Sequence, residues 1–244
     1  MKTLKFTLIA LLILLLASCG SNTKKFVKNP VDIMIKDMSN LNSFVIILYD
    51  MDYFEDENAY KHQYQILKDD IDTVTSETTS WLVVSDVFFK QHQEDMGMEV
   101  ASKKDGVVTK VVSPAGYSNY VGNEKYGNWQ RNSSGGSFWA FYGQYMFMSH
   151  MFRMSMFPVS HGYYNNYRSN YYGRQGYYGN NGARTYGTSS AYNKGRTNSR
   201  WNKRPSSFKQ NVRNRVSQST AAKSHTRSRY SQSRSRSRSG SYGK

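Results

Sequence analysis

The last acidic residue of this chain is Glu124, and this asymmetry limits where a folded core can form. The sequence carries 33 lysines and arginines against 17 aspartates and glutamates, and every arginine lies at or after Arg131. Hydrophobic residues make up 38% of the 244 positions, which is too few for a core that runs the whole length. We therefore expect one acidic folded body followed by a basic tail, an organisation that disfavours a large enzyme.

Residues 1–18 have the organisation of a secretion signal. Lys2 and Lys5 precede an apolar run over residues 6–16, and small residues follow it. The run is shorter than the roughly 20 residues that a membrane-spanning helix needs, so a permanent transmembrane anchor is the weaker interpretation. We predict that residues 1–18 are a signal peptide that directs the chain out of the cytoplasm.

The residues Leu16-Ala17-Ser18-Cys19 resemble the lipobox of bacterial lipoproteins. The resemblance implies cleavage before Cys19, transfer of a diacylglyceryl group to its thiol and acylation of the new amino terminus. Two or three acyl chains, at ~0.8 kcal/mol per buried methylene, hold a protein stably on a membrane. Gly20, in place of an aspartate, implies the outer membrane in a cell with two membranes. Cys19 is the only cysteine, which excludes a disulfide within the chain; the alternative is a free thiol in an ordinary signal peptide.

Residues 30–129 have the pattern of a small α+β domain, joined to the lipobox by a polar tether over residues 19–29. A continuous apolar run predicts one buried strand, and alternation of aromatic and polar residues predicts a half-exposed one. The sheet is expected to be mostly antiparallel. The expected strands span residues 44–49, 60–66, 73–84, 99–103 and 107–112.

Two short helices and one tight turn complete this predicted domain. Pro30 suits the first turn of a helix that Asn29 caps. Ser85 is placed to cap a second helix, which Gly97 ends. The dipeptide Asp105-Gly106 has the chemistry that a two-residue hairpin turn requires.

No combination of side chains in this domain meets the requirements for catalysis or metal binding. The acidic run over residues 50–57 could hold calcium, but it lacks the glycine and the terminal glutamate of the known calcium loop. We interpret this run, and the second one over residues 69–72, as solvated acidic turns. His62 and His92 each lack a second ligand at zinc spacing. We predict no catalytic residue, no metal site and no cofactor.

Residues 130–157 combine a Gly/Ser joint with an aromatic, methionine-rich hydrophobic segment. In residues 138–157 the only formal charge is Arg153, and a helical wheel is apolar almost all round. We predict a helix that either packs on the domain or lies at the membrane interface, because His150 and Arg153 near its centre disfavour a spanning helix. The predicted membrane or partner contacts are Phe138, Trp139, Phe141, Tyr145, Phe147 and Phe152.

Order is predicted to end at Pro158, because residues 158–244 are low-complexity sequence rich in Tyr, Gly, Arg and Ser. Interspersed tyrosine and arginine allow cation–π and charge contacts with polyanions. Because the signal peptide exports the chain, the expected partners are anionic lipid, an envelope glycan or the acidic body of another copy, and not nucleic acid. The alternative is a solvated tail without a partner. The predicted polyanion-binding residues are Arg227, Arg229, Arg234, Arg236 and Arg238.

The stretch from Met96 to Gly122, with Ser137-Phe138-Trp139 and the Tyr/Arg/Gly tail, is similar to a group of uncharacterised bacterial lipoproteins. The resemblance brings no assigned activity. Two functions fit the sequence. The first is a non-enzymatic, lipid-anchored envelope lipoprotein with a membrane- or partner-binding, structural or stress-related role. The second is a secreted module whose basic tail captures a polyanion, either nucleic acid or an anionic glycan.

Overall fold

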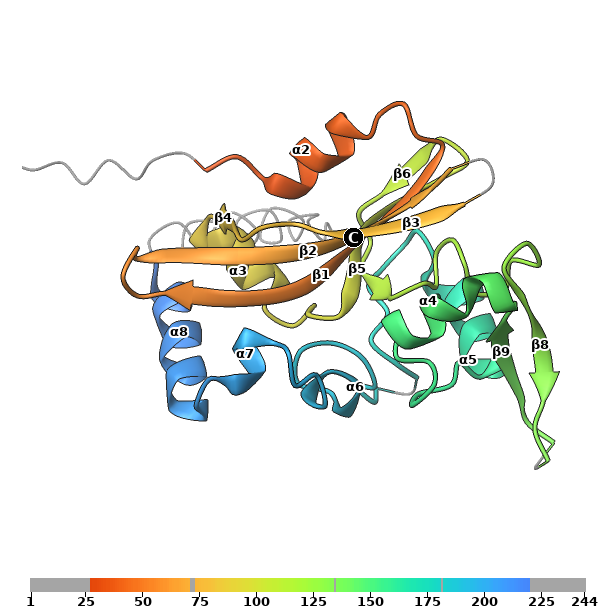
Figure 1. The fold of residues 1–244 in the computed structure, drawn as a ribbon. Coiled ribbons are helices and arrows are strands. Elements are labelled where there is room, and N and C mark those ends of the chain that lie inside the picture. The colour runs from red at the N-terminus through yellow and green to blue at the C-terminus, as the bar shows by residue number, and fades with distance from the viewer. Residues whose placement is uncertain (1–26, 71–72, 134, 181, 220–244) are drawn as a thin grey trace, which may run out of the picture.

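The computed structural model describes residues 27–70, 73–133, 135–180 and 182–219 (Figure 1). The signal peptide, Cys19 and the predicted polyanion-binding arginines between 227 and 238 lie outside the described residues. The described chain combines an antiparallel sheet with several helices, which confirms the predicted α+β class.

A seven-stranded antiparallel sheet forms the centre of the molecule. Its main path runs in the order β3-β2-β1-β5-β6, while β4 also pairs with β2 and β7 also pairs with β5. The predicted third strand is divided into β3 and β4, which pair with different parts of β2. The strands are β1 (Ser43–Phe54), β2 (Ala59–Asp69), β3 (Val74–Thr78), β4 (Leu82–Val84), β5 (Met98–Lys104), β6 (Val107–Thr109) and β7 (Ser113–Pro114).

Two helices begin where the sequence predicts them. α2 (Pro30–Asp37) follows Asn29, whose Oδ1 accepts a backbone N–H at 2.9 Å. α3 (Asp86–His92) follows Ser85, whose Oγ accepts a backbone N–H at 3.1 Å. Each cap satisfies a donor that the first helical turn leaves free, so a local signal is enough to place the helix start.

The turn between β5 and β6 also follows from local chemistry. Asp105 and Gly106 have φ values of 49° and 81°, the left-handed conformation that both central residues of a type I′ turn require. The predicted hairpin is therefore confirmed, although β6 is shorter than expected.

β1 divides the core between the two faces of the sheet. Because successive side chains on a strand point to opposite faces, Phe44 and Ile46 pack with α2, whereas Val45 and Ile47 join a large cluster on the other face. This cluster, here named the aromatic cluster, includes Tyr117, Tyr120, Tyr126, Trp139, Phe141, Tyr145, Phe152, Tyr167, Tyr177, Tyr186 and Tyr192. The predicted buried strand is confirmed, and it extends to the end of β1 beyond a bulge that follows Leu48. Figure 1 shows α2 on one side of the sheet and the C-terminal helices on the other.

The segment that follows the main sheet forms a hairpin and a short helix, so the predicted single helix over residues 138–157 is wrong. β8 (Gly127–Arg131) pairs with β9 (Ser137–Phe141), and α4 (Met146–Met151) follows the 3-10 turn η1 (Gly143–Tyr145). A segment that is apolar almost all round fits a strand as well as a helix, and a helical wheel cannot separate the two.

Two features of the β8–β9 hairpin explain why a strand forms here. A Cβ at Gly127 would lie 2.1 Å from the carbonyl oxygen of Ala140, so only glycine allows the two strands to approach this closely. Trp129 lies opposite Trp139, with ring centroids 5.2 Å apart in an edge-to-face contact. Cross-strand aromatic pairs of this kind stabilise antiparallel strands.

Residues 158–180 and 182–219 are folded, so the predicted disorder from Pro158 is wrong over these ranges. Tyr167, Tyr177, Tyr186 and Tyr192 are buried in the cluster that contains Val45 of β1. An aromatic ring buries about 150–250 Å², so these tyrosines supply core surface that a count of aliphatic residues overlooks. The predicted domain boundary at residue 129 does not divide this core. The elements are α5 (His161–Asn166), the π-helical turn η2 (Tyr167–Tyr171), α6 (Ala191–Lys194), α7 (Arg200–Lys203) and α8 (Ser206–Gln218).

Candidate functional site

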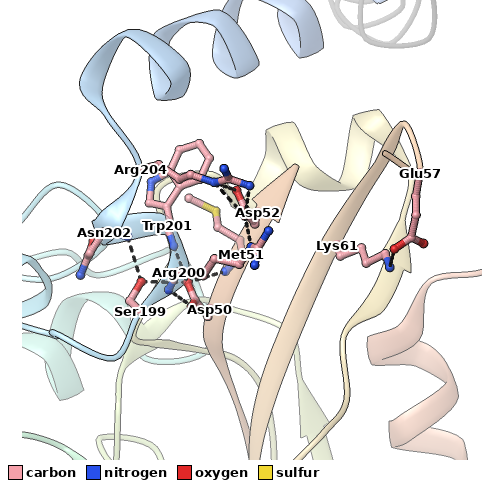
Figure 2. Close-up of polar contacts among 10 residues, drawn as sticks. All are labelled: Asp50, Met51, Asp52, Glu57, Lys61, Ser199, Arg200, Trp201, Asn202 and Arg204. Atoms are coloured by element: carbon pink, nitrogen blue, oxygen red, sulfur yellow. Dashed lines mark hydrogen bonds and ion pairs between the residues drawn. The ribbon is translucent and has the colours of Figure 1, made fainter. Parts of the chain in front are cut away.

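Two carboxylates of the acidic run, Asp50 and Asp52, are buried inside the fold rather than solvated. They are 2% and 0% exposed, whereas residues 55–57 after the end of β1 are exposed as predicted. Figure 2 shows both carboxylates directed toward the segment that carries Ser199, Arg200 and Arg204. The interpretation of the whole run as a solvated turn is therefore wrong at these two positions.

The Asp50 carboxylate accepts hydrogen bonds from one end of α7 and from its own strand. Its donors are Ser199 Oγ at 2.8 Å and the backbone N–H groups of Arg200 at 2.5 Å, Trp201 at 3.3 Å and Met51 at 2.9 Å. Burial raises the pKa of Asp50, and these hydrogen bonds oppose that rise. Ser199 Oγ caps α7 by accepting the Asn202 N–H at 3.1 Å, and the Asp50 carboxylate accepts the N–H groups of the first two helical residues.

The Asp52 carboxylate holds two guanidinium groups. Arg204 donates from Nη2 at 2.8 Å and from Nε at 3.1 Å to the same carboxylate oxygen, and Arg200 donates from Nε (Figure 2). Nearby, the Trp201 ring is 1% exposed and packs with Phe89 of α3. These contacts attach the C-terminal segment to β1, which is a structural role and leaves neither carboxylate open to a ligand.

A second buried polar group lies at His62, between β2 and α3. Its Nδ1 lies 3.0 Å from the Tyr64 hydroxyl, its Nε2 has no hydrogen-bond partner, and burial together with neighbouring His92 lowers its pKa. His92 in turn contacts Asp95 at 2.8 Å. Although the fold brings the two histidines close, the described residues contain no group of three or more His, Cys, Asp or Glu side chains that could hold a metal ion.

A third buried group, Glu99, lies within the aromatic cluster. Ser113 Oγ donates to it at 2.9 Å, the Gly116 N–H donates at 2.6 Å, and Ser118 Oγ donates as well. Burial raises the pKa of Glu99 to about 7, and the three donors only partly offset that effect. Glu99 is only 1% exposed, so this carboxyl group is closed to a ligand even though its pKa lies near neutral pH.

An apolar groove lies on the surface between β9 and α4 and is here named the β9–α4 groove. It has a volume of about 290 Å³. Met146 and Phe147 on α4 are 48% and 38% exposed, and Met156 just beyond it is 66% exposed. The lining residues are Phe138, Trp139, Ala140, Phe141, Met146, Ser149, His150, Met154, Ser155 and Pro158.

The six predicted contact residues divide between this groove and the core. Phe138, Trp139 and Phe141 line the groove, although the last two rings are each only 4% exposed. Phe147 is exposed outside the groove lining, whereas Tyr145 and Phe152 are buried in the aromatic cluster and are not available for contact. The exposed methionines are not among the predicted residues, although the side chain of methionine suits a binding face that adapts its shape.

Basic residues of the folded part of the tail pair with acids of the body within one chain. Arg184 and Arg213 lie 3.4 and 3.2 Å from the Glu94 carboxylate, and Arg200 and Arg204 bind Asp52. Self-association between acidic body and basic tail of different copies stays a prediction, as does polyanion binding by the arginines beyond residue 219.

Within the described ranges, no helix has the length and apolar character needed to cross a membrane. No family model, curated protein or solved structure matches this chain.

Proposed function

We propose that this chain is a non-enzymatic lipoprotein of the cell envelope, anchored through acylated Cys19, with a membrane- or partner-binding structural role. The observation that carries the proposal is the sequence Leu16-Ala17-Ser18-Cys19, which follows a basic and then apolar amino terminus. A lipid at Cys19 keeps the folded domain within a short tether of a membrane surface. In a cell with two membranes, the outer membrane is the proposed location.

The β9–α4 groove supports this proposal because it offers an apolar surface to a membrane or to a partner there. Met146, Phe147 and Met156 expose side chains that burial against lipid would stabilise. Methionine side chains adapt their shape to irregular apolar surfaces, which suits contact with lipid chains. The half-buried Phe138 and the floor of the groove add aromatic area.

The buried titratable groups support a structural rather than a catalytic role. Asp50 and Asp52 hold α7, and Glu99 is enclosed by its hydrogen-bond donors. A general acid or base must reach a substrate proton, and these carboxyl groups face the interior. The proposal therefore assigns them to the stability of the fold.

The proposed anchor is tested by fractionation of cells that express the wild-type chain or Cys19→Ala. We expect wild-type protein to leave the membrane fraction only in detergent, whereas buffer should release most of the variant and leave a weakly bound remainder. A wild-type protein that is soluble without detergent would contradict the proposal.

The proposed contact surface is tested in the same cells with Met146→Asp, at an exposed residue that lines the groove, and Phe147→Asp, at its exposed neighbour on α4, each combined with Cys19→Ala. The matched control is Val107→Asp, since Val107 is 71% exposed on β6 and does not line the groove. We expect the two groove-side variants to lower residual membrane association and the control to leave it unchanged. Equal residual association in all three would exclude this face as a contact surface.

The charge distribution favours polyanion capture as a second candidate function, because no acidic residue follows Glu124. Such binding would fall steeply as salt rises and show no sequence preference for nucleic acid. Salt titration of the processed chain with DNA and with an anionic glycan tests this candidate. Binding to anionic vesicles but to neither polyanion would exclude it.

A further inference from the structure

A polar cleft of about 350 Å³ lies beside the β9–α4 groove, and His150 at the end of α4 lines both. One wall comes from Tyr49 and Gln65 on β1 and β2, and the other comes from the segment that follows α6. The lining residues are Tyr49, Gln65, His150, Met151, Arg153, Gly195, Arg196, Thr197 and Asn198. An apolar groove and a basic cleft thus adjoin each other at the surface of α4.

The two arginines of this cleft have no acidic partner among the described residues. Arg153 donates from Nη1 to the Gly195 carbonyl at 3.5 Å, and its Nε is buried without a hydrogen-bond partner. Arg196 lies over the Tyr49 ring, with its guanidinium carbon 4.3 Å from the ring centroid. By contrast, Arg204 in the same part of the chain binds a carboxylate. The cleft therefore holds two positive charges that an anion can neutralise.

The backbone at Arg153 indicates that its side chain has a role other than ending α4. The N–H of Arg153 bonds to the His150 carbonyl at 3.1 Å, and the N–H of Met154 bonds to the Ser149 carbonyl at 2.8 Å. This pair of bonds is the Schellman motif, in which the residue at the position of Arg153 is left-handed and is usually glycine. Arg153 adopts a φ of 53° there, a conformation that costs free energy for any residue with a Cβ.

We propose that Arg153 and Arg196 bind the phosphate headgroup of an anionic phospholipid whose acyl chain lies in the β9–α4 groove. Guanidinium groups bind phosphate oxygens through paired, charge-assisted hydrogen bonds. Gln65, Thr197 and Asn198 supply polar groups around the same cleft. The proposal rests on the proposed membrane location and adds a specific lipid class to it.

The test uses the processed chain from residue 19 with Cys19→Ala, so that no covalent lipid contributes to binding. Isothermal titration calorimetry measures binding of dihexanoylphosphatidylglycerol, its deacylated headgroup glycerophosphoglycerol, dihexanoylphosphatidylcholine and inorganic phosphate. Because the lipids are short-chain and used below micelle formation, the result does not depend on whether Cys19 is acylated in cells. Failure of this site and failure of the anchor are therefore distinguishable.

The variants are Arg153→Gly and Arg196→Gln, with Arg174→Gln as the control that removes an exposed arginine outside the cleft. Glycine at position 153 removes the guanidinium and suits the left-handed backbone, so this variant is expected to fold. Since a charge-assisted hydrogen bond is lost, each cleft variant should weaken binding of dihexanoylphosphatidylglycerol by about tenfold, and the control should not.

The proposal also predicts the order of the ligands. Dihexanoylphosphatidylglycerol should bind most tightly, since its anionic headgroup and its acyl chains both contribute. The proposal is overturned if both cleft variants bind this lipid like the wild type. It is also overturned if inorganic phosphate or glycerophosphoglycerol binds as tightly as the lipid, because the source of the anion would then not be a lipid.

Discussion

Replacing both arginines that bind Asp52 should destabilise the fold more than replacing Asp52 itself. The Asp52 side chain is fully buried, whereas the Arg200 side chain is 49% exposed and that of Arg204 is 24% exposed. In the double variant Arg200→Gln/Arg204→Gln, a charged carboxylate is left in the protein interior. In Asp52→Asn, the two guanidinium groups can turn toward water and recover much of their hydration.

The expected magnitudes follow from this difference in exposure. Removing one side of a buried ion pair costs about 3–5 kcal/mol, so we expect a loss of about 4 kcal/mol for the double arginine variant. For Asp52→Asn we expect about 2 kcal/mol, because the exposed Arg200 and the partly exposed Arg204 lose less than a fully buried charge does when its partner is removed. The single variant Arg200→Gln should cost about 1 kcal/mol, since Arg204 keeps its donors at 2.8 and 3.1 Å.

Urea unfolding of the processed chain at pH 7 measures these losses. Tryptophan fluorescence is a suitable probe because Trp201 lies between Arg200 and Arg204 in a buried site. A change in midpoint with an unchanged dependence on urea reports a change in stability. The reasoning is refuted if the order of the losses is reversed, or if the double arginine variant loses less than about 1 kcal/mol.

Three further perturbations test separate parts of the fold by the same unfolding measurement. Burial raises the pKa of Glu99 to about 7, above its unfolded value near 4.3. Between these two pH values the folded chain keeps the Glu99 proton that the unfolded chain has lost. Stability should therefore fall by about 3 kcal/mol as pH rises from about 4.5 to about 7, and a Glu99→Gln variant that keeps this slope would contradict the assignment. Arg153→Gly should raise stability by up to about 1 kcal/mol through relief of the left-handed backbone, whereas a loss would show that the side chain stabilises the fold. Trp201→Ala should lower the free energy of unfolding by about 3–5 kcal/mol and make residues 184–219 susceptible to limited proteolysis. Unchanged resistance to the protease would show that these residues stay folded without the Trp201 ring.

Local sequence signals were sufficient for the helix starts and for the tight turn. Asn29 and Ser85 each satisfy a backbone donor within three residues, and Asp105-Gly106 adopts the left-handed conformations that its turn requires. The class of the fold followed from such signals, because the strands between them carried apolar runs or alternation.

The extent of the folded region could not be predicted from composition. Tyr177 and Trp201 lie in a segment whose composition is typical of low-complexity sequence. Each is nevertheless almost completely buried against segments far away in the chain. The burial of Asp50 could not be predicted for the same reason, since its hydrogen-bond partner Ser199 lies 149 positions further along the sequence. No local pattern connects two such residues, so the sequence predicts solvated carboxylates where the fold buries them.

The candidate surface was predicted in part. Aromatic and methionine content identified the segment, but a wrong helical period assigned Tyr145 and Phe152 to a surface when both lie in the core. The strand β9 places Phe138 and Trp139 in the groove instead. The basic cleft with Arg153 and Arg196 depends on residues brought together by tertiary structure, and the sequence alone carries no signal for it.

The proposed anchor can be tested directly by mass spectrometry of the amino-terminal peptide of the protein extracted from native membranes. The account predicts a mature chain that begins at Cys19 and carries the mass of a diacylglyceryl group together with an acyl group on its amino terminus. The Cys19→Ala variant should lack both additions. A wild-type chain that retains residues 1–18, or begins elsewhere with an unmodified thiol, would contradict the account.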